Sequence, residues 1–225
     1  MCGRYYRRSD KQRIAEAFRS GVPPSFEILP SYNVAPQTFQ PIVRLSRDTH
    51  ERELVQLRWG FIPYWAKDAK IGYSTINAKS ETVSASTVFR EALSYRRCLV
   101  PADGFYEWQK LDVKNRQPWA IGLRDGSIFA FAGLWERWKD RASGQPLETY
   151  TILTTEANEL TAPIHNRMPV ILTPHDYERW LAPANPARLP VDLLRPLSAE
   201  EMTAWKVGSE VGNVRNDDPA LCNPI

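Results

Sequence analysis

Short runs of residues with β-strand character recur along most of the chain, and they constrain its fold more than any other feature. In about eight runs, apolar and polar residues alternate or β-branched and aromatic residues gather, with Gly, Pro or polar residues at the ends. The runs are PIVRL, ELVQLRWGFIP, RRCLVP, GFYEWQ, PWAIGL, SIFAFAGLWERW, YTILTT and MPVILT. Helices do not alternate regularly with these strands, which disfavours a doubly wound parallel sheet. We expect an α+β fold with a curled, mainly antiparallel sheet and a few peripheral helices.

Helical patterns occur in three places, over residues 10–20, 84–95 and 173–181. In the first, Ser9 and Gln12 have the spacing of a capping box, and Gly21 is a typical residue for the end of a helix. In the third, Thr173 is the expected N-cap and Pro174 suits the first helical position.

Length and composition are those of one ordinary folded domain. The chain has 225 residues, of which 43% are hydrophobic and 24% charged, and this usage excludes disordered, collagen-like and coiled-coil proteins. Five of the 18 prolines lie between Pro23 and Pro41, which predicts an ordered, extended loop there. The sequence has neither an internal repeat nor a low-complexity linker. We expect a single domain over residues 1–225 with a mobile tail from about 217 to 225.

The three cysteines, Cys2, Cys98 and Cys222, indicate a reducing compartment. Their odd number and their spacing argue against a disulfide framework and a zinc knuckle. No apolar run approaches the roughly 18 residues of a membrane span, and the N-terminus lacks a signal-peptide pattern. We expect a cytoplasmic protein without membrane association, metal or cofactor, because no metal-ligand cluster or phosphate-binding glycine loop is visible. Cys98 and Cys222 are expected to be dispensable.

Cys2 is the most informative position in the sequence. Initiator methionine is generally removed before a small second residue, which would place a free α-amine beside the Cys2 thiol. Reference pKa values of about 8 and 8.5 give both groups a reactive fraction near neutrality. Such an aminothiol can attack an amide or ester carbonyl, with its own amine as base, or capture an aldehyde as a thiazolidine. The alternative is an incidental cysteine at a frayed terminus.

Several longer motifs favour aldehyde capture. In order, they are MCGRY, SYNVAP, RWGFIPYW, INAKSET, RRCLVPADGFYEW, IHNRMPVIL and VGNVRN. From residue 2 to about residue 216 they resemble the SRAP (SOS response-associated peptidase) family of abasic-site processing proteins. The resemblance implies a single compact SRAP fold with a shallow, positively charged DNA groove. It also implies that the N-terminal cysteine covalently captures abasic sites in single-stranded DNA and shields the lesion. Self-reversal, an associated lyase activity and a peptidase activity limited to the exposure of Cys2 are further implications.

The same resemblance assigns three more catalytic residues. An abasic deoxyribose must open to its aldehyde, and imine formation must expel water, so a general acid and base are needed. His165 in IHNRMP resembles the histidine that assists ring opening, and Glu107 in GFYEW resembles the carboxylate that moves protons at the imine and thiazolidine. Asn77 in INAKSET resembles the asparagine that holds the cysteine and sugar; from the residues alone it could equally be a turn asparagine.

The alternation of the GFYEW strand bears on Glu107 independently. It places Glu107 with Phe105 and Gln109, opposite Tyr106 and Trp108, so that the side chain points either to solvent or to a buried site. The aromatic neighbours favour partial burial, which would raise the pKa of the Glu107 carboxyl group and suit a proton shuttle.

A DNA-binding surface needs positively charged side chains that contact phosphates and flat apolar side chains that stack on bases. By resemblance, Arg4 and Arg167 lie near the DNA backbone, whereas Lys79 stands where many relatives have arginine and lacks the planar fork. The candidates for wedging or stacking beside the lesion are Pro36, Trp65 and Trp108.

Two other functions fit part of the sequence. An N-terminal cysteine amidohydrolase also begins Cys-Gly, but the downstream pattern of such an enzyme is missing. A non-catalytic single-strand DNA-binding module would use only tryptophan and arginine and would tolerate loss of Cys2. We expect a monomer that binds single-stranded DNA containing abasic sites, with the replication machinery as a candidate partner.

Overall fold

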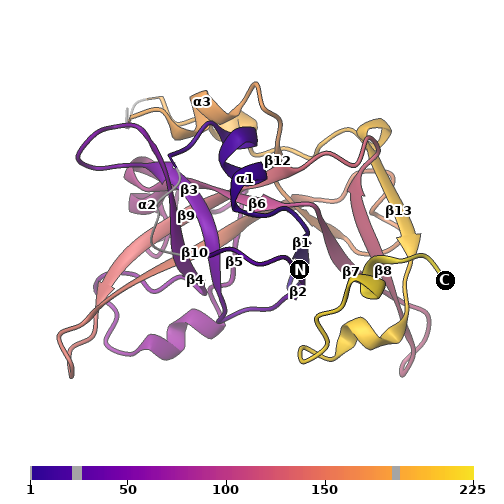
Figure 1. The fold of residues 1–225 in the computed structure, drawn as a ribbon. Helices are drawn as coiled ribbons and strands as arrows, with labels where there is room; N and C mark the ends of the chain where they lie inside the picture. The colour runs from indigo at the N-terminus through magenta and orange to yellow at the C-terminus, as the bar shows by residue number, and fades with distance from the viewer. Residues whose placement is uncertain (1, 22–26, 184–187) are drawn as a thin grey trace.

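Two β-sheets packed face to face form the body of the protein in a computed structural model, which describes residues 2–21, 27–183 and 188–225 (Figure 1). The first sheet has the strand order β13 (Met202–Lys206), β8 (Arg116–Leu123), β7 (Gly104–Lys110), β1 (Tyr5–Arg7) and β2 (Ser31–Val34). The second sheet is built around β11 (Arg167–Pro169), β10 (Pro146–Glu156), β4 (Arg52–Trp59), β3 (Phe39–Leu45), β6 (Arg97–Ala102), β9 (Phe129–Lys139) and β12 (Ile171–Leu172), with β5 (Asn77–Lys79) paired to β10. Each predicted strand run overlaps a single strand, except that MPVILT is divided between the end of β11 and β12.

The expected single curled sheet is only partly correct. Most pairings are antiparallel, but β10 also runs parallel to β4, with Tyr150 opposite Trp59, and parallel to β5, with Ile152 opposite Asn77. These partners are about 75 to 90 residues apart in the chain, and local alternation carries no information on such distant pairing. The result is a mixed second sheet beside an antiparallel first sheet.

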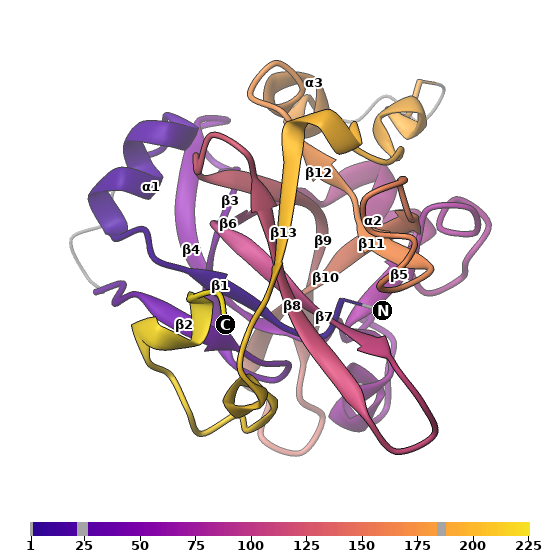
Figure 2. The ribbon, with the colours of Figure 1, turned by 90° about the vertical axis from the view of Figure 1, so that its right-hand side faces the viewer.

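The hydrophobic core lies in layers that follow the sheets. One cluster fills the space between the sheets and includes Phe105 from the first and Phe131 from the second. A second cluster lies between the other face of the second sheet and the helices, where Phe18 and Trp180 pack. A third, around Tyr106, covers the outer face of the first sheet and is closed by the C-terminal segment, shown in yellow in Figure 2. Among the candidate catalytic residues, Cys2 belongs to the inter-sheet cluster, and Ile76 and Ile164, which precede Asn77 and His165, pack against it or within it.

The helices are shorter than the sequence patterns predicted. They are α1 (Lys11–Phe18), α2 (Arg90–Tyr95) and α3 (Tyr177–Leu181). The predicted capping box at Ser9 is wrong: Asp10 caps α1 by accepting the backbone N–H of Arg13 at 2.9 Å, while Ser9 Oγ donates to Asp103. The helix ends at Arg19 in a left-handed conformation, so Gly21 is not its terminator.

Short 3₁₀ helices occupy several connections between these elements. They are η1 (Ala69–Tyr73), η2 (Val191–Leu193), η3 (Ala199–Glu201), η4 (Ser209–Gly212) and η5 (Pro219–Cys222). The segment expected to be an extended proline-rich loop contains β2, while its residues 22–26 lie outside the described part of the chain.

The C-terminal residues pack against the first sheet, although the sequence predicted a mobile tail. Asp217 accepts hydrogen bonds from Ser31 Oγ and the backbone N–H of Tyr32, and Leu221 is buried. Cys222 Sγ lies 3.0 Å from the Tyr106 hydroxyl. The apolar residues of this segment complete the third cluster, which a composition rich in Asp, Asn and Pro did not reveal.

Candidate active site and DNA-binding surface

Cys2 lies three residues before the start of β1, and its side chain is fully buried in the inter-sheet cluster. Its Sγ donates to the carbonyl oxygen of Arg4 at 3.9 Å. Burial raises the pKa of the Cys2 thiol far above its usual range, and the negative charge of Glu107 raises it further. The thiol is therefore protonated at neutral pH, and it lies within electrostatic reach of Glu107.

Glu107 lies on β7 and is only 4% exposed. Its neighbour Phe105 belongs to the inter-sheet cluster, whereas Tyr106 and Trp108 contact the cluster on the outer face, so the predicted alternation is confirmed. Burial raises the pKa of Glu107 from 4.5 to about 7. The carboxyl group can therefore both donate and accept a proton near neutral pH.

His165 follows a tight turn in which its backbone N–H donates to Thr161 O at 2.9 Å. Its Nδ1 lies 3.0 Å from the backbone nitrogen of Arg167 and 3.2 Å from the Arg167 carbonyl oxygen, so it accepts the N–H in one tautomer and donates to the carbonyl in the other. Burial lowers the pKa of His165, and the positive charges of Arg116 and Arg167 contribute to that shift. The lowered pKa favours the neutral imidazole at neutral pH.

A hydrogen bond between side chain and backbone joins the Glu107 strand to the His165 turn. Gln109, two residues after Glu107, donates from Nε2 to Pro163 O at 3.1 Å. Trp119 Nε1 in turn donates to Gln109 Oε1 at 3.1 Å, which fixes the orientation of the amide. Ile164, adjacent to His165, packs in the same cluster as Cys2.

Asn77 is the first residue of β5 and is not in a turn. Its Nδ2 donates to Ile152 O at 3.4 Å across the parallel pair, and the preceding Ile76 packs against the inter-sheet cluster. Its Oδ1 is buried and accepts no hydrogen bond from the described residues. An unpaired buried carbonyl costs free energy, and this acceptor is suited to a ligand that supplies a donor.

Arg4 is anchored by the C-terminal segment. Its Nη1 donates to Asn33 Oδ1 at 2.7 Å and to Val211 O at 3.0 Å, and its guanidinium lies 5.8 Å from the centre of the Trp108 ring. Its Nε is buried and unpaired among the described residues. Arg4 is thus held in one orientation by internal contacts.

Arg167 is also engaged within the protein. Its two terminal nitrogens form a bidentate ion pair with Glu81, with Nη2 at 3.0 Å from Oε2, and Nη2 donates to Thr154 O at 2.7 Å. Lys79 is exposed on the neighbouring β5, opposite Thr154. A DNA phosphate at Arg167, which was predicted to lie near the DNA backbone, would therefore have Glu81 as an acidic competitor.

The three apolar candidates differ in exposure. Trp65 is 44% exposed in the segment between β4 and η1, whereas Pro36 and Trp108 are half-buried. Tyr64, adjacent to Trp65, and Tyr73, the last residue of η1, also carry exposed aromatic rings. Tyr64 lies within the RWGFIPYW motif, but neither tyrosine was predicted as a binding residue.

Sequence reasoning also missed two residues that orient the predicted cations. Asn33 lies within SYNVAP and Glu81 within INAKSET, so both were inside recognised motifs. Asn33 Nδ2 additionally donates to the carbonyl oxygens of Val211, Asn213 and Asn216. A buried asparagine with so many partners can be identified only once the fold brings residues 33 and 211 together.

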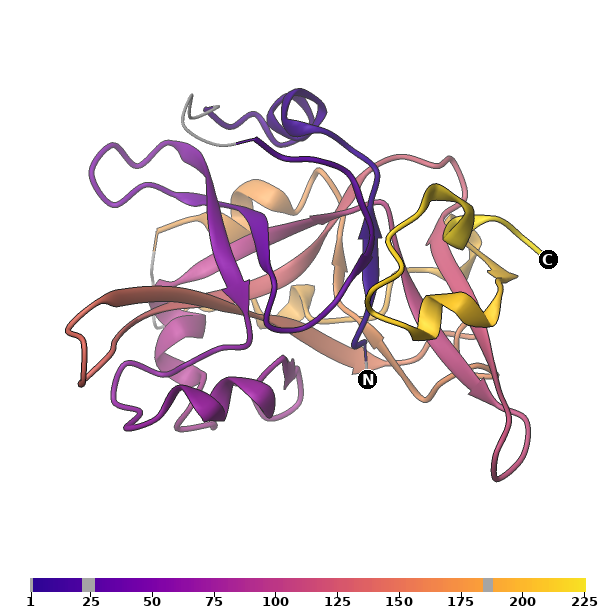
Figure 3. The ribbon, with the colours of Figure 1, turned by 60° about the horizontal axis from the view of Figure 1, so that its bottom comes forward.

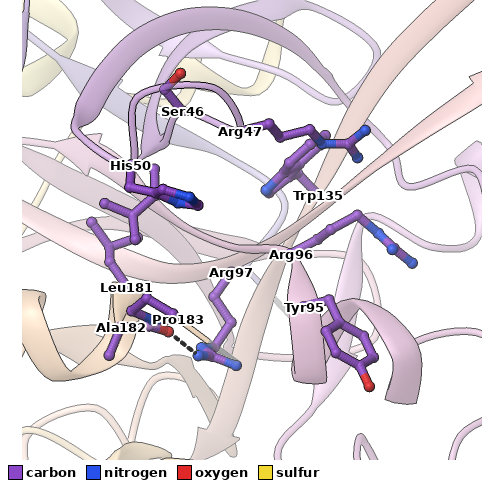
Figure 4. Close-up of a pocket in the computed structure, with 11 residues that line it drawn as sticks. Ser46, Arg47, His50, Tyr95, Arg96, Arg97, Trp135, Leu181, Ala182 and Pro183 are labelled. Carbon is purple, nitrogen blue, oxygen red and sulfur yellow. Dashed lines mark hydrogen bonds between the residues drawn. The ribbon is translucent and has the colours of Figure 1, made fainter. Parts of the chain in front are cut away.

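A separate pocket of about 370 Å³ contains none of these candidates (Figure 4). Arg97 is its most connected residue, and it donates to the carbonyl oxygens of Leu93, Ser94, Trp180 and Ala182. These bonds tie the ends of α2 and α3 to β6, so the role of Arg97 is structural.

Within the described ranges, no group of three or more His, Cys, Asp or Glu side chains is placed to hold a metal ion. No helix in the described part of the chain is both long and apolar enough to cross a membrane.

Comparison with known proteins decides the family. The family model described as SOS response associated peptidase (SRAP) matches residues 1–214. This chain belongs to the SRAP family. The abasic site processing protein YoqW of Bacillus subtilis (strain 168) is 47% identical over 224 residues, which cover 98% of each chain. The abasic site processing protein HMCES of Gallus gallus is 35% identical over 226 residues, which cover 87% of this chain and 66% of that protein.

The SRAP fold is also found among solved structures. A protein from Bacteroides thetaiotaomicron has a TM-score of 0.88 at 29% identity, with both chains covered in full. A protein from Bordetella bronchiseptica has a TM-score of 0.77 at 30% identity, covering 92% of this chain and 100% of the other. The family resemblance of the sequence motifs is confirmed.

Proposed function

We propose that this protein processes abasic sites in single-stranded DNA by forming a covalent thiazolidine between the lesion and the N-terminal aminothiol of Cys2. The observation that carries the proposal is the buried Cys2 thiol within reach of Glu107, a carboxyl group with a pKa of about 7. Membership of a family whose relatives include abasic site processing proteins supports the choice of substrate.

Capture begins when removal of Met1 leaves the α-amine of Cys2. The amine adds to the aldehyde carbon of the opened sugar, and loss of one water gives an imine. The thiol sulfur then attacks the imine carbon, its proton passes to the nitrogen, and the five-membered ring closes. The sum is aldehyde plus aminothiol giving thiazolidine plus water, with no oxidant or cofactor consumed.

Glu107 supports the steps at the imine. Because the Cys2 thiol is protonated at neutral pH, a base must accept its proton as sulfur attacks, and a nearby acid must protonate the departing hydroxyl. A carboxyl group with a pKa of about 7 is present in both forms at neutral pH. The same group can return a proton to sulfur, which would make the adduct reversible.

His165 and Asn77 are suited to contact the sugar of the abasic site and to assist its opening. A neutral imidazole can give or take a proton at its ring nitrogens, and such a group at the sugar hydroxyl or ring oxygen assists the opening of the hemiacetal. The unpaired Oδ1 of Asn77 can accept a hydrogen bond from a sugar hydroxyl or from the Cys2 amine. An associated lyase activity would require a base to remove a proton from the carbon next to the imine carbon, after which the carbon–oxygen bond to the 3′ phosphate breaks and the phosphate leaves with the downstream strand. Peptidase activity would be limited to the release of Met1.

DNA binding would position the lesion over Cys2. We assign Arg4, Arg167 and Lys79 to phosphates, and Trp65, Trp108 and Pro36 to bases beside the lesion. Stacking contributes about 1 to 3 kcal/mol per base without sequence preference, which fits a lesion that occurs in any context.

The test is covalent capture of a single-stranded oligonucleotide carrying one abasic site, assayed on a denaturing gel. The protein is expected to give a denaturant-resistant band, and an oligonucleotide carrying the tetrahydrofuran analogue, which has no aldehyde, is expected to give none. Cys222→Ser serves as the matched thiol control, because serine retains a partner for the Tyr106 hydroxyl. Absence of a band with the natural lesion, or an equal band with the analogue, would overturn the proposal.

A further inference from the structure

The β7–β8 hairpin carries Glu107 on its stem and ends in an apolar tip exposed to solvent. Leu111 is 62% exposed and Val113 is 91% exposed, the highest value among the large hydrophobic side chains of the described residues. The tip is ordered by Asp112, whose carboxylate accepts the backbone N–H groups of Lys114 and Asn115 at 2.8 and 2.9 Å. Two aliphatic side chains are therefore held in water on a preformed turn.

Basic residues surround this tip. Lys110, Lys114 and Arg116 are all exposed, and none takes part in an ion pair within the described ranges. Asp112 is the only acidic residue between positions 110 and 116, so the tip carries a net charge of about +2. An apolar surface bordered by unpaired cations is complementary to a nucleic-acid strand, which offers phosphates beside apolar sugar and base surfaces.

The hairpin is continuous with the candidate active site. Gln109, at the end of the stem, is bonded to Pro163 O beside His165. Arg116 is close enough to His165 for its charge to add to the effect of burial on the histidine pKa. At about 3.3 Å per strand residue, the tip lies roughly 13 Å beyond Glu107, which corresponds to about four stacked nucleotides.

We propose that the tip of the β7–β8 hairpin is a second contact for the DNA strand that carries the lesion. Leu111 and Val113 pack against its sugars and bases, while Lys110, Lys114 and Arg116 pair with its phosphates. The contact rests on the proposed function, and it extends the binding surface a few nucleotides to one side of the captured site.

The chain supplies a matched control hairpin. The β9–β10 hairpin also ends in an exposed, basic turn, with Lys139 and Arg141, and Figure 3 shows it at the far side of the molecule from the β7–β8 hairpin. Two test variants remove either the charge, Lys110→Ala with Lys114→Ala, or the apolar surface, Leu111→Ser with Val113→Ser. The control variant is Lys139→Ala with Arg141→Ala. All of these side chains are exposed, so the fold is retained.

Binding is measured by fluorescence anisotropy on single strands containing the tetrahydrofuran analogue, with flanks of either two or ten nucleotides on each side. On the long strand, the charge variant is expected to reduce the slope of log K against log salt by about 1.4, the value for two phosphate contacts. The apolar variant is expected to weaken binding about threefold to tenfold without changing the slope. Wild type and both variants are expected to bind the short strand alike, because it does not reach the tip.

Two outcomes would overturn the proposal: equal binding of the long strand by wild type and both tip variants, or an equal loss in the β9–β10 control. The first outcome would favour a protein as the occupant of the tip. Neither outcome affects the proposed function, because covalent capture by wild-type protein is read separately on a denaturing gel. A missing covalent band with tip-dependent anisotropy would instead reject thiazolidine formation and keep the DNA contact.

Discussion

Arg167 and Glu81 form a bidentate ion pair beside the candidate active site, with Arg167 Nη2 at 3.0 Å from Glu81 Oε2. Glu81 is half exposed, so the pair contributes little to the stability of the fold. Under the proposed function the pair bears on DNA binding, because a phosphate that approached Arg167 would compete with the carboxylate already paired with the guanidinium.

Replacing Glu81 should therefore strengthen DNA binding. We expect Glu81→Gln to raise the affinity for single-stranded DNA and to increase the slope of log K against log salt by up to about 0.7, because Arg167 then contributes a full phosphate contact. Anisotropy titrations at several salt concentrations measure both quantities. Arg167→Ala should have the opposite effect on the slope, and an unchanged slope in both variants would remove Arg167 from the DNA-binding surface.

Asn33 should matter for stability and for DNA binding together. Asn33→Ala removes the partner of Arg4 Nη1 and three hydrogen bonds to the C-terminal segment, so we expect a loss of about 1 to 3 kcal/mol in the free energy of unfolding. Urea denaturation measures the loss. We also expect Asn33→Ala to bind DNA more weakly, because Arg4 loses its partner, and Arg4→Ala should show the same weaker binding. An Asn33→Ala protein with wild-type stability and affinity would show that Arg4 is oriented by other contacts.

Burial of Glu107 should make folding depend on pH. The pKa is about 7 in the folded protein and 4.5 without burial, so the folded state binds more protons between these values. Its contribution to stability is therefore complete below pH 4.5 and is lost as pH rises through 7, by about 3 kcal/mol in total. Glu107→Gln should be more stable than wild type at pH 8 and should lose much of this dependence.

The measurement is urea denaturation of both proteins at pH 5, 6, 7 and 8. The exposed Glu200→Gln substitution is the matched control and should follow wild type. If Glu107→Gln and wild type show the same change between pH 5 and pH 8, the Glu107 carboxyl group does not titrate in this range.

Glu107 and His165 should affect different steps of capture. His165→Ala should slow adduct formation with little change in the final yield, because it acts on ring opening. Glu107→Gln should impair ring closure and also slow the release of preformed adduct, since both steps move a proton at sulfur or nitrogen. Time courses of formation and of transfer to competitor DNA across pH distinguish the two. Equal factors on both rates in both variants would mean that the pair acts as one unit.

The sequence predicted local structure well where the pattern and the environment agree. The alternation in GFYEW placed Glu107 on the same face as Phe105, and its aromatic neighbours favoured partial burial. Burial and a raised pKa are found in the structure. The predicted strands were found because their apolar residues face one of the hydrophobic clusters. The alternation of side chains along a strand depends only on neighbouring residues, so it can be predicted directly from the sequence.

Features that depend on distant residues could not be predicted. The parallel pairing of β10 with β4 and β5, and the contacts of Asn33 with residues 211–216, join segments that no local pattern relates. The N-terminal cap of α1 also depends on a distant residue. Ser9 fits the capping motif, but its hydroxyl donates to Asp103, which directly follows β6. Asp10 caps the helix instead. Likewise, the motifs predicted that Arg167 lies near the DNA backbone but did not indicate that its guanidinium forms an ion pair with Glu81.

The central claim is that Cys2 itself forms the bond to the lesion, and peptide mass mapping of the purified adduct tests it most directly. The protein is incubated with a short abasic-site oligonucleotide without a reductant, digested and analysed by tandem mass spectrometry. We predict a chain lacking Met1, joined at residue 2 to the opened sugar, with a total mass equal to protein plus DNA minus one water. An adduct at a lysine, an adduct that survives only after borohydride reduction, or the same heat-stable adduct in Cys2→Ala would contradict the account.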